Sequence, residues 1–393
     1  MSWRPPIQWC GASETGTELM TQATEGNQKK FLAAYLQRGL KPDFWWMDAG
    51  WYPCQGKWWN TGTWEFDKAR FPRGLRPVTD DLHAHGVKAI LWFEPERVTP
   101  GTWLASQHPE WIFGGKAGGL LNLGQPEAWN WLVNHVDRLI TDGGIDIYRQ
   151  DFNMDPLPFW RARDTEERKG ITENRYVTAL LAYWDELLRR NPNMLYDNCA
   201  CGGRRNDLES MRRGVPYTKS DYADDPVGVQ GQTYGISMWL PYYAATWGTS
   251  DDPYLCRSRM AHVVGACLDL RQKDQFRQLP RRLEEWRKTV PCYWGDFWPL
   301  SPYSLDGKAW IAWQFDLPES GRGVVQAFRR AESPLGSACY KLRGLDPAAR
   351  YRCVDSDRPG ATESTGRDLM DKGLAIVIPQ KPGAAIITYE RRP

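Results

Sequence analysis

The chain has 393 residues, which is enough for a barrel of about 250 to 300 residues and one smaller domain. Its 50 Lys and Arg residues nearly balance 48 Asp and Glu residues without any long basic block, which argues against a nucleic-acid-binding surface. Nine scattered cysteines, no leader-like amino terminus and no run of 18 apolar residues predict a reduced, cytoplasmic protein with no membrane contact.

Short apolar runs alternate with helical patterns as far as about residue 300. The predicted strands are 6–10, 44–48, 88–93, 145–148, 194–197, 217–220, 236–240 and 264–268, and helical patterns lie between them, for instance at 31–36, 129–140 and 176–188. Eight such alternations favour a (β/α)8 barrel. A doubly wound open sheet is the alternative, but the segment after the first strand, 10–14, lacks a glycine-rich phosphate-binding pattern.

The pattern changes near residue 301. Strands are predicted at 309–315, 323–328, 374–378 and 384–389, with no helical pattern between them. We therefore expect an α/β fold with two domains, a catalytic (β/α)8 TIM barrel at 1–300 and a small antiparallel β-sandwich at 301–393.

Acidic residues lie where several predicted barrel strands end. Because the carboxyl ends of barrel strands line the active site, we expect these side chains to converge there. Clustered carboxylates repel one another and so acquire the raised pKa values that acid/base chemistry needs, although any single one could be a solvated loop acid or a helix cap. The strand-end residues are Trp9, Asp48, Glu94, Glu96, Arg149, Asp151, Asn198, Cys199, Asp221 and Trp239.

Two chemistries use such a cluster, namely metal-dependent hydrolysis and cleavage of a glycosidic bond. The five histidines fall in or beside helical patterns and not at strand ends, whereas the chain has 22 tryptophans. Some of these, such as Trp58 and Trp59 in the polar segment 55–62, suit the apolar faces of sugar rings. These features favour a glycosidase with no metal and no cofactor, whose two catalytic carboxylates would lie about 5 to 5.5 Å apart if the enzyme retains the anomeric configuration.

Four motifs occur in order along the chain: WMDAGW at 46–51, LWFEPERV at 91–98, YRQDFN at 148–153 and NCACGGR at 198–204. They are followed by Ser220-Asp221, and the Asp residues at 151 and 221 are 70 positions apart. Together these motifs resemble the α-galactosidases of glycoside hydrolase family 36, over the barrel and, more loosely, over the β domain. The resemblance implies a retaining exo-α-glycosidase that hydrolyses terminal α-linked galactosides of an oligosaccharide or glycoconjugate through a covalent glycosyl-enzyme.

The resemblance also implies a role for individual residues. Asp151 would be the nucleophile and Asp221 the general acid/base. The residues expected to bind the sugar are Asp48, Trp51, Trp92, Glu94, Arg149, Asn153, Cys199 and Gly202.

Three departures from the family pattern leave alternatives open. Ala49 stands where the family has the second acid of a hydroxyl-binding pair, and Tyr217-Thr218-Lys219 replaces a tryptophan before the acid/base. The first predicted strand begins within ten residues of Met1, so we expect the usual amino-terminal β-sandwich to be missing, and the sequence does not indicate the oligomeric state. An α-N-acetylgalactosaminidase, another α-glycosidase or transglycosidase, a non-catalytic glycan-binding barrel and a metal-dependent hydrolase remain the alternatives.

Overall fold

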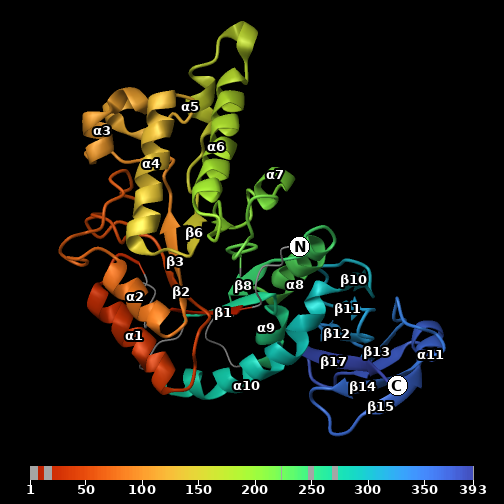
Figure 1. Cartoon of the computed structure of the whole chain (residues 1–393). Helices are drawn as coiled ribbons and strands as arrows, with labels where there is room; N and C mark the ends of the chain where they lie inside the picture. Colours follow the sequence, from red (N-terminus) through yellow and green to blue (C-terminus); the bar gives the residue numbers. More distant parts are fainter. Residues whose placement is uncertain (1–7, 13–19, 223, 247–251, 268–272, 393) are drawn as a thin grey trace. The chain divides into compact units, whose positions relative to one another are not determined.

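The computed structural model describes residues 8–12, 20–222, 224–246, 252–267 and 273–392 (Figure 1). These residues divide into two compact units. The first comprises Gln8–Thr218 with residues 266 and 267, and the second comprises 219–265 and 273–392.

Parallel strands form the centre of the first unit. Their order in the sheet is β7-β6-β3-β2-β1, and every neighbouring pair is parallel. The strands are β1 Gln8–Ala12, β2 Phe44–Met47, β3 Lys88–Phe93, β6 Ile147–Gln150 and β7 Leu195–Asn198. In β3 every residue except Lys88 is buried, as is typical of a parallel strand covered on both faces.

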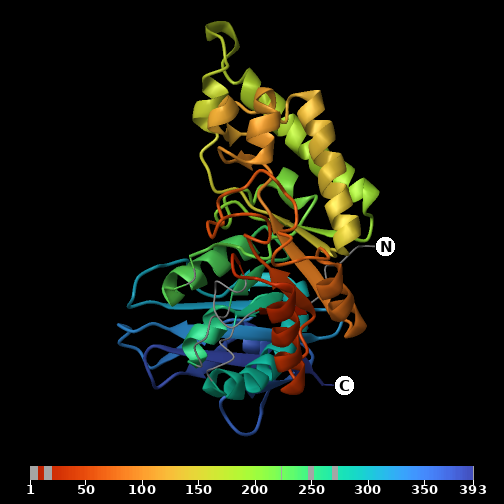
Figure 2. The ribbon, with the colours of Figure 1, turned by 90° about the vertical axis from the view of Figure 1, so that its left-hand side faces the viewer.

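Helices connect these strands. The main ones are α1 Glu25–Gln37, α2 Arg76–Ala84, α4 Pro126–Gly143 and α6 Ile171–Arg190. Pro126 begins α4 because proline fits the first helical position, and Gly144 ends it in the left-handed conformation with φ 65°. Helices α4 and α6 pack against each other, as both views show (Figure 1, Figure 2).

Short elements follow the carboxyl ends of three strands in the first unit. After β3 come β4 Arg97–Val98, α3 Trp103–Gln107, η1 Pro109–Trp111, η2 Gly115–Ala117 and β5 Gly119–Leu120. After β6 come α5 Leu157–Arg161 and η3 Glu166–Arg168, and after β7 comes α7 Leu208–Met211. These segments directly follow strand ends at which predicted site residues lie.

The second unit begins with mixed helices and strands. These are α8 Pro226–Ser237, β8 Ala244–Thr246, α9 Pro253–Ser258, β9 Val263–Cys267 up to residue 265, α10 Lys273–Thr289 and η4 Val290–Trp294. Strand β8 pairs with β9 in parallel. An antiparallel sheet of order β10-β11-β12-β17-β14-β15 follows. Its strands are β10 Asp296–Pro299, β11 Trp310–Leu317, β12 Arg322–Arg329, β14 Arg350–Asp355, β15 Thr362–Thr365 and β17 Gly383–Arg391.

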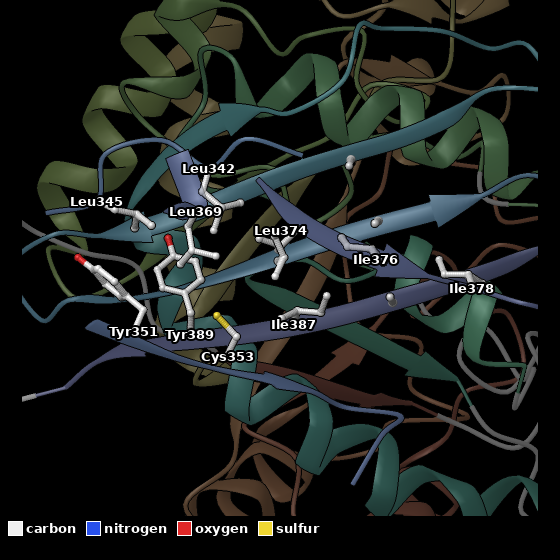
Figure 3. Packing of buried hydrophobic residues seen from close by; sticks show 14 residues of the cluster. Leu342, Leu345, Tyr351, Cys353, Leu369, Leu374, Ile376, Ile378, Ile387 and Tyr389 are labelled. Carbon is white, nitrogen blue, oxygen red and sulfur yellow. The ribbon is translucent and has the colours of Figure 1, made fainter. Parts of the chain in front are cut away.

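A second small sheet covers one face of this antiparallel sheet. It pairs β13 Ser337–Tyr340 with β16 Leu374–Val377, and the short helix α11 Gly366–Asp371 precedes β16. Leu342, Ile376 and Ile387 belong to the apolar core of this region, which Figure 3 shows. Strand β10 precedes residue 301, and the domain boundary at 300/301 stays a prediction.

Two predicted strands are wrong. Residues 236–240 contain the end of helix α8, because Asp225 caps that helix by accepting from the N–H groups of Val227 and Gly228, and Pro226 occupies its first turn. The strand in this part of the chain is β8, and Trp239 lies in the turn after α8. Residues 217–220 form no strand either, and the nearest pairing is an isolated bridge between Val215 and Asp197. The predicted strands 6–10 and 264–268 extend beyond the described residues, because residues 6, 7 and 268 are not among them.

Candidate active site

Four strands of the first unit end next to predicted site residues. Asp48 follows β2, Glu94 follows β3, Asp151 follows β6 and Cys199 follows β7. Because these strands are parallel, their carboxyl ends share one edge of the sheet. The indole N–H of Trp92, at the end of β3, donates to Asp151 Oδ2 at 3.2 Å and so links two of these ends directly.

Asp151 is nearly buried, with 9% of its surface exposed, and is surrounded by donors. Its Oδ1 accepts from the backbone N–H of Phe152 at 2.7 Å and from that of Cys201 at 3.1 Å. Burial by itself would raise the pKa of this carboxyl, but the Arg149 guanidinium and the hydrogen bonds outweigh burial and lower the pKa below its ordinary value. Asp151 is therefore a carboxylate at neutral pH, as a nucleophile must be.

Arg149, on β6, is the cation beside Asp151. Its Nη1 donates to the fully buried Asp197 on β7 at 2.5 Å, and its guanidinium lies 4.3 Å from the centre of the Trp46 ring. Asp197 is held in turn by the backbone N–H of Tyr217 at 2.8 Å. The position of the positive charge is thus fixed by an ion pair and an aromatic face.

Asp48 is half-buried and accepts two hydrogen bonds. The Trp46 indole donates to Oδ2 at 3.0 Å, and the backbone N–H of Ala49 donates to Oδ1 at 2.7 Å. Burial raises the pKa of Asp48, against the lowering effect of Arg149. Ala49 itself is 1% exposed.

Glu94 is completely buried and holds the segment that follows Asp151. It accepts from the backbone N–H of Asn153 and pairs with Arg97 at 3.0 Å, while Arg97 donates to the Asn153 carbonyl. Both backbone groups of Asn153 are therefore fixed by this ion pair. Burial raises the pKa of Glu94 to about 7.

Glu96 differs from Glu94 because all its partners belong to the protein interior. It accepts from Gln150 at 2.8 Å, from Tyr176 at 2.7 Å and twice from Arg205 at 2.6 and 2.8 Å. This saturated set of contacts indicates that Glu96 joins the ends of strands instead of facing a ligand.

Three other predicted sugar-binding residues of the first unit are buried, namely Trp51, Cys199 and Gly202. Trp51 is fully buried and donates its indole N–H to the Trp92 carbonyl at 2.8 Å, so it holds the backbone at the end of β3. The backbone N–H of Cys199, which is buried, donates to the Gln150 carbonyl at 2.8 Å. Gly202 is buried with φ 79°.

One contact to Asp151 was missed by sequence reasoning. Cys201 has a positive φ of 46°, its backbone N–H donates to the Asp151 carboxylate, and its thiol lies 3.0 Å from Asn153 Oδ1. The Cys-Gly-Gly run at 201–203 is the signal that could have found this tight turn.

Asp221 belongs to the second unit. It is exposed, in the loop that precedes helix α8. The neighbouring Lys219 is buried, its ammonium donates to Thr233 Oγ1 at 2.5 Å, and burial lowers its pKa to about 7. The structure thus brings Asp48, Glu94, Arg149, Asp151 and Asn153 together in one unit, and it places Asp221 in the other.

The described residues lack two structural features. They contain no group of three or more His, Cys, Asp or Glu side chains arranged to hold a metal ion. None of the helices in that part of the chain combines the length and the apolar character needed to cross a membrane.

Parallel strands that end in clustered carboxylates, followed by an antiparallel β domain, form the arrangement of barrel-type glycoside hydrolases. The chain belongs to the melibiase family, whose model matches residues 27–264. The model of the glycosyl hydrolase family 36 C-terminal domain matches residues 310–386.

Curated relatives of the chain are named α-galactosidases. Alpha-galactosidase 1 of Pediococcus pentosaceus is 26% identical over 318 residues, a match covering 75% of this chain and 43% of the relative. Alpha-galactosidase C of Emericella nidulans is 27% identical over 383 residues, covering 88% and 48%. The chain spans about half the length of the curated relatives it matches.

Solved structures confirm the predicted fold class. The α-galactosidase from Lactobacillus brevis aligns with a TM-score of 0.84 at 19% identity, over 99% of this chain and 55% of that one. AgaA, a GH36 α-galactosidase from Geobacillus stearothermophilus, aligns with a TM-score of 0.83 at 19% identity, over 98% and 55%. The chain is therefore a (β/α)8 barrel followed by a C-terminal antiparallel β domain.

Proposed function

We propose that the protein is a retaining exo-α-glycosidase that hydrolyses terminal α-linked galactosides of oligosaccharides or glycoconjugates. The observation that carries the proposal is the environment of Asp151, a nearly buried carboxylate whose pKa is lowered by Arg149 and by backbone donors in a melibiase-family barrel. The names of the relatives support galactose as the sugar, and AgaA has been crystallised with raffinose and with stachyose.

Asp151 carries out the first displacement in this mechanism. Its carboxylate oxygen attacks the anomeric carbon while the bond from that carbon to the leaving oxygen breaks, and Asp221 gives its proton to the leaving oxygen. In the second displacement Asp221 takes a proton from water, the water oxygen attacks the anomeric carbon, and the ester bond to Asp151 breaks. Two inversions restore the α configuration.

The assignment of Asp221 as acid/base rests on the sequence. Two of the AgaA complexes carry a replaced aspartate. One aspartate is replaced by asparagine in the complex with raffinose, and another is replaced by alanine in the complex with stachyose. The separation of the two replaced aspartates along that chain equals the separation of Asp151 and Asp221 along this one. This match supports the same pair of acids here.

The polar groups around Asp151 provide the sugar-binding contacts in this proposal. Asp48 accepts hydrogen bonds from sugar hydroxyls, and Arg149 and Asn153 contact the ring beside the nucleophile. Ala49 offers no second carboxylate for the hydroxyls, and a charge-assisted hydrogen bond contributes about 1.5 to 3 kcal/mol. The preferred sugar is therefore to be measured with a panel of aryl α-glycosides that includes the galactoside and the N-acetylgalactosaminide.

Substitution of the two acids tests the proposal. Asp151→Ala should lower kcat on an aryl α-galactoside at least about a thousandfold, because no nucleophile remains to form the intermediate. Asp221→Ala should reduce turnover of raffinose far more than turnover of a dinitrophenyl galactoside, since a good leaving group needs little protonation.

The exposed acid Asp80, on α2, provides the control, and Asp80→Asn should leave both activities unchanged. Near-normal turnover by Asp151→Ala would refute its role as nucleophile. Equal losses on both substrates in Asp221→Ala would refute its role as acid.

A further inference from the structure

A rigid loop in the first unit carries two adjacent tryptophans, Trp58 and Trp59. The loop is closed by hydrogen bonds to the Cys54 carbonyl from the backbone N–H of Lys57 and from the Asn60 side chain, each at 3.0 Å. The Tyr52 hydroxyl donates to the Trp58 carbonyl. The backbone that carries the two indoles is thus fixed before any ligand binds.

Two independent contacts place this loop beside the nucleophile. The Trp58 ring meets the edge of Trp92 at 6.0 Å between centroids and 90° between planes, and Trp92 donates to Asp151. On another side, the Arg97 guanidinium lies 5.5 Å from the centre of the Trp58 ring and donates to the Asn153 carbonyl. Trp58 is therefore separated from the Asp151 carboxylate by a single side chain, that of Trp92.

Trp59 extends this aromatic path to solvent. Its ring lies 5.8 Å from that of Trp58 at 86° between planes, and its carbonyl accepts from Thr99 Oγ1 at 2.8 Å. Although Trp92 is 1% exposed, Trp59 is 46% exposed. The exposed indole of Trp59 lies on a fixed backbone, with two rings between it and Asp151, and it offers a flat apolar surface to a ligand.

Sugar rings have an apolar face of C–H groups that packs on such a surface. An exo-acting enzyme holds the terminal sugar at the nucleophile, so the next unit of the substrate lies toward solvent. Because the backbone that carries the indole is already fixed, little conformational entropy is lost when a ligand binds against the ring.

We propose that Trp59, supported by Trp58, forms a leaving-group subsite that stacks against the sugar attached to the scissile oxygen. The preferred substrates are then α-galactosides whose leaving group is itself a sugar. This inference rests on the proposed function, because it assumes that Asp151 attacks a terminal galactoside.

Comparison of two substrates tests the subsite. Raffinose carries a sugar leaving group, whereas α-galactosyl fluoride carries none. Trp59→Ala should lower kcat/KM on raffinose about tenfold, as expected for the loss of one stacking contact, and should leave kcat/KM on the fluoride within about twofold. Trp59→Phe should keep most of the raffinose activity because it retains a flat ring.

Trp103→Ala is the matched control, since Trp103 on α3 is 43% exposed, and it should leave both values unchanged. A second measurement is the dissociation constant of raffinose for Asp151→Ala, which Trp59→Ala should raise about tenfold while the constant for galactose stays within about twofold. Equal losses on raffinose and fluoride, or no loss on raffinose, would overturn the subsite and leave the proposed function intact. Failure of the unsubstituted protein to cleave either substrate would overturn the proposed function and this inference with it.

Discussion

The pKa values of two carboxyls in the first unit, Asp151 and Glu94, are shifted in opposite directions by their surroundings. Arg149 and backbone donors lower the pKa of Asp151, whereas burial raises that of Glu94 to about 7. A raised pKa is what a general acid needs. Glu94, however, is completely buried and engaged with Asn153 and Arg97, which makes it a positioning residue for the segment that follows Asp151.

Removal of the Arg149 charge should change the pH dependence of the reaction. Asp151 must be ionised to attack, and Arg149 lowers its pKa, so Arg149→Met should raise that pKa. The acidic limb of kcat/KM against pH should move to higher pH by about one unit or more. The limb is to be measured with a dinitrophenyl galactoside, whose cleavage depends little on the acid.

Arg149→Lys keeps a positive charge and is the matched control, with an acidic limb close to that of the unsubstituted enzyme. Because Arg149→Met also leaves the buried Asp197 without its cation, thermal unfolding has to show that the variant is folded at the assay temperature. An unchanged limb in a folded Arg149→Met variant would contradict the electrostatic role of Arg149.

At the scale of elements, a buried network joins the strand ends of the first unit to helix α6. Glu96, after β3, accepts from Gln150 on β6, from Tyr176 on α6 and from Arg205 after β7. The network holds in register three segments that also carry site residues. Its ion pair matters because a buried charge without its partner is strongly unfavourable.

Arg205→Met should lower the free energy of unfolding by about 3 to 5 kcal/mol, because it leaves the Glu96 carboxylate buried and uncompensated. Urea unfolding followed by circular dichroism measures this value. Arg189→Met removes an exposed arginine that pairs with Glu186 and should cost less than about 1 kcal/mol. Equal effects of the two substitutions would show that the network does not hold these elements together.

Regular elements could be predicted from sequence where one pattern dominates. Strand β3 is a continuous apolar run and was predicted at its observed bounds, and α4 was predicted from its apolar face between Pro126 and Gly144. The last turn of helix α8 resembles a short strand because its end is apolar, and the helix is indicated instead by its capping residue Asp225.

The candidate site could be predicted only in part. The strand-end positions of Asp48, Glu94 and Asp151 followed from the barrel pattern. The donor that Cys201 presents to Asp151 depends on a left-handed turn, and the burial of Trp51 depends on its contact with Trp92. Neither follows from residue spacing, because both arise from tertiary packing.

At the scale of the whole molecule, the family match at 27–264 contains both proposed acids, Asp151 and Asp221. A second match at 310–386 covers most of the antiparallel β domain. The matched segments thus carry both proposed acids and most of the β domain, while the chain spans about half the length of its curated relatives.

The stereochemistry of hydrolysis tests the double displacement directly. Proton NMR of an aryl α-galactoside, recorded in the first minutes before mutarotation, identifies the anomer of galactose that the enzyme releases. Two displacements at the anomeric carbon, the first by Asp151 and the second by water, predict that α-galactose appears first and β-galactose only later, by mutarotation. Release of β-galactose first would mean a single displacement by water and would contradict a nucleophilic role for Asp151.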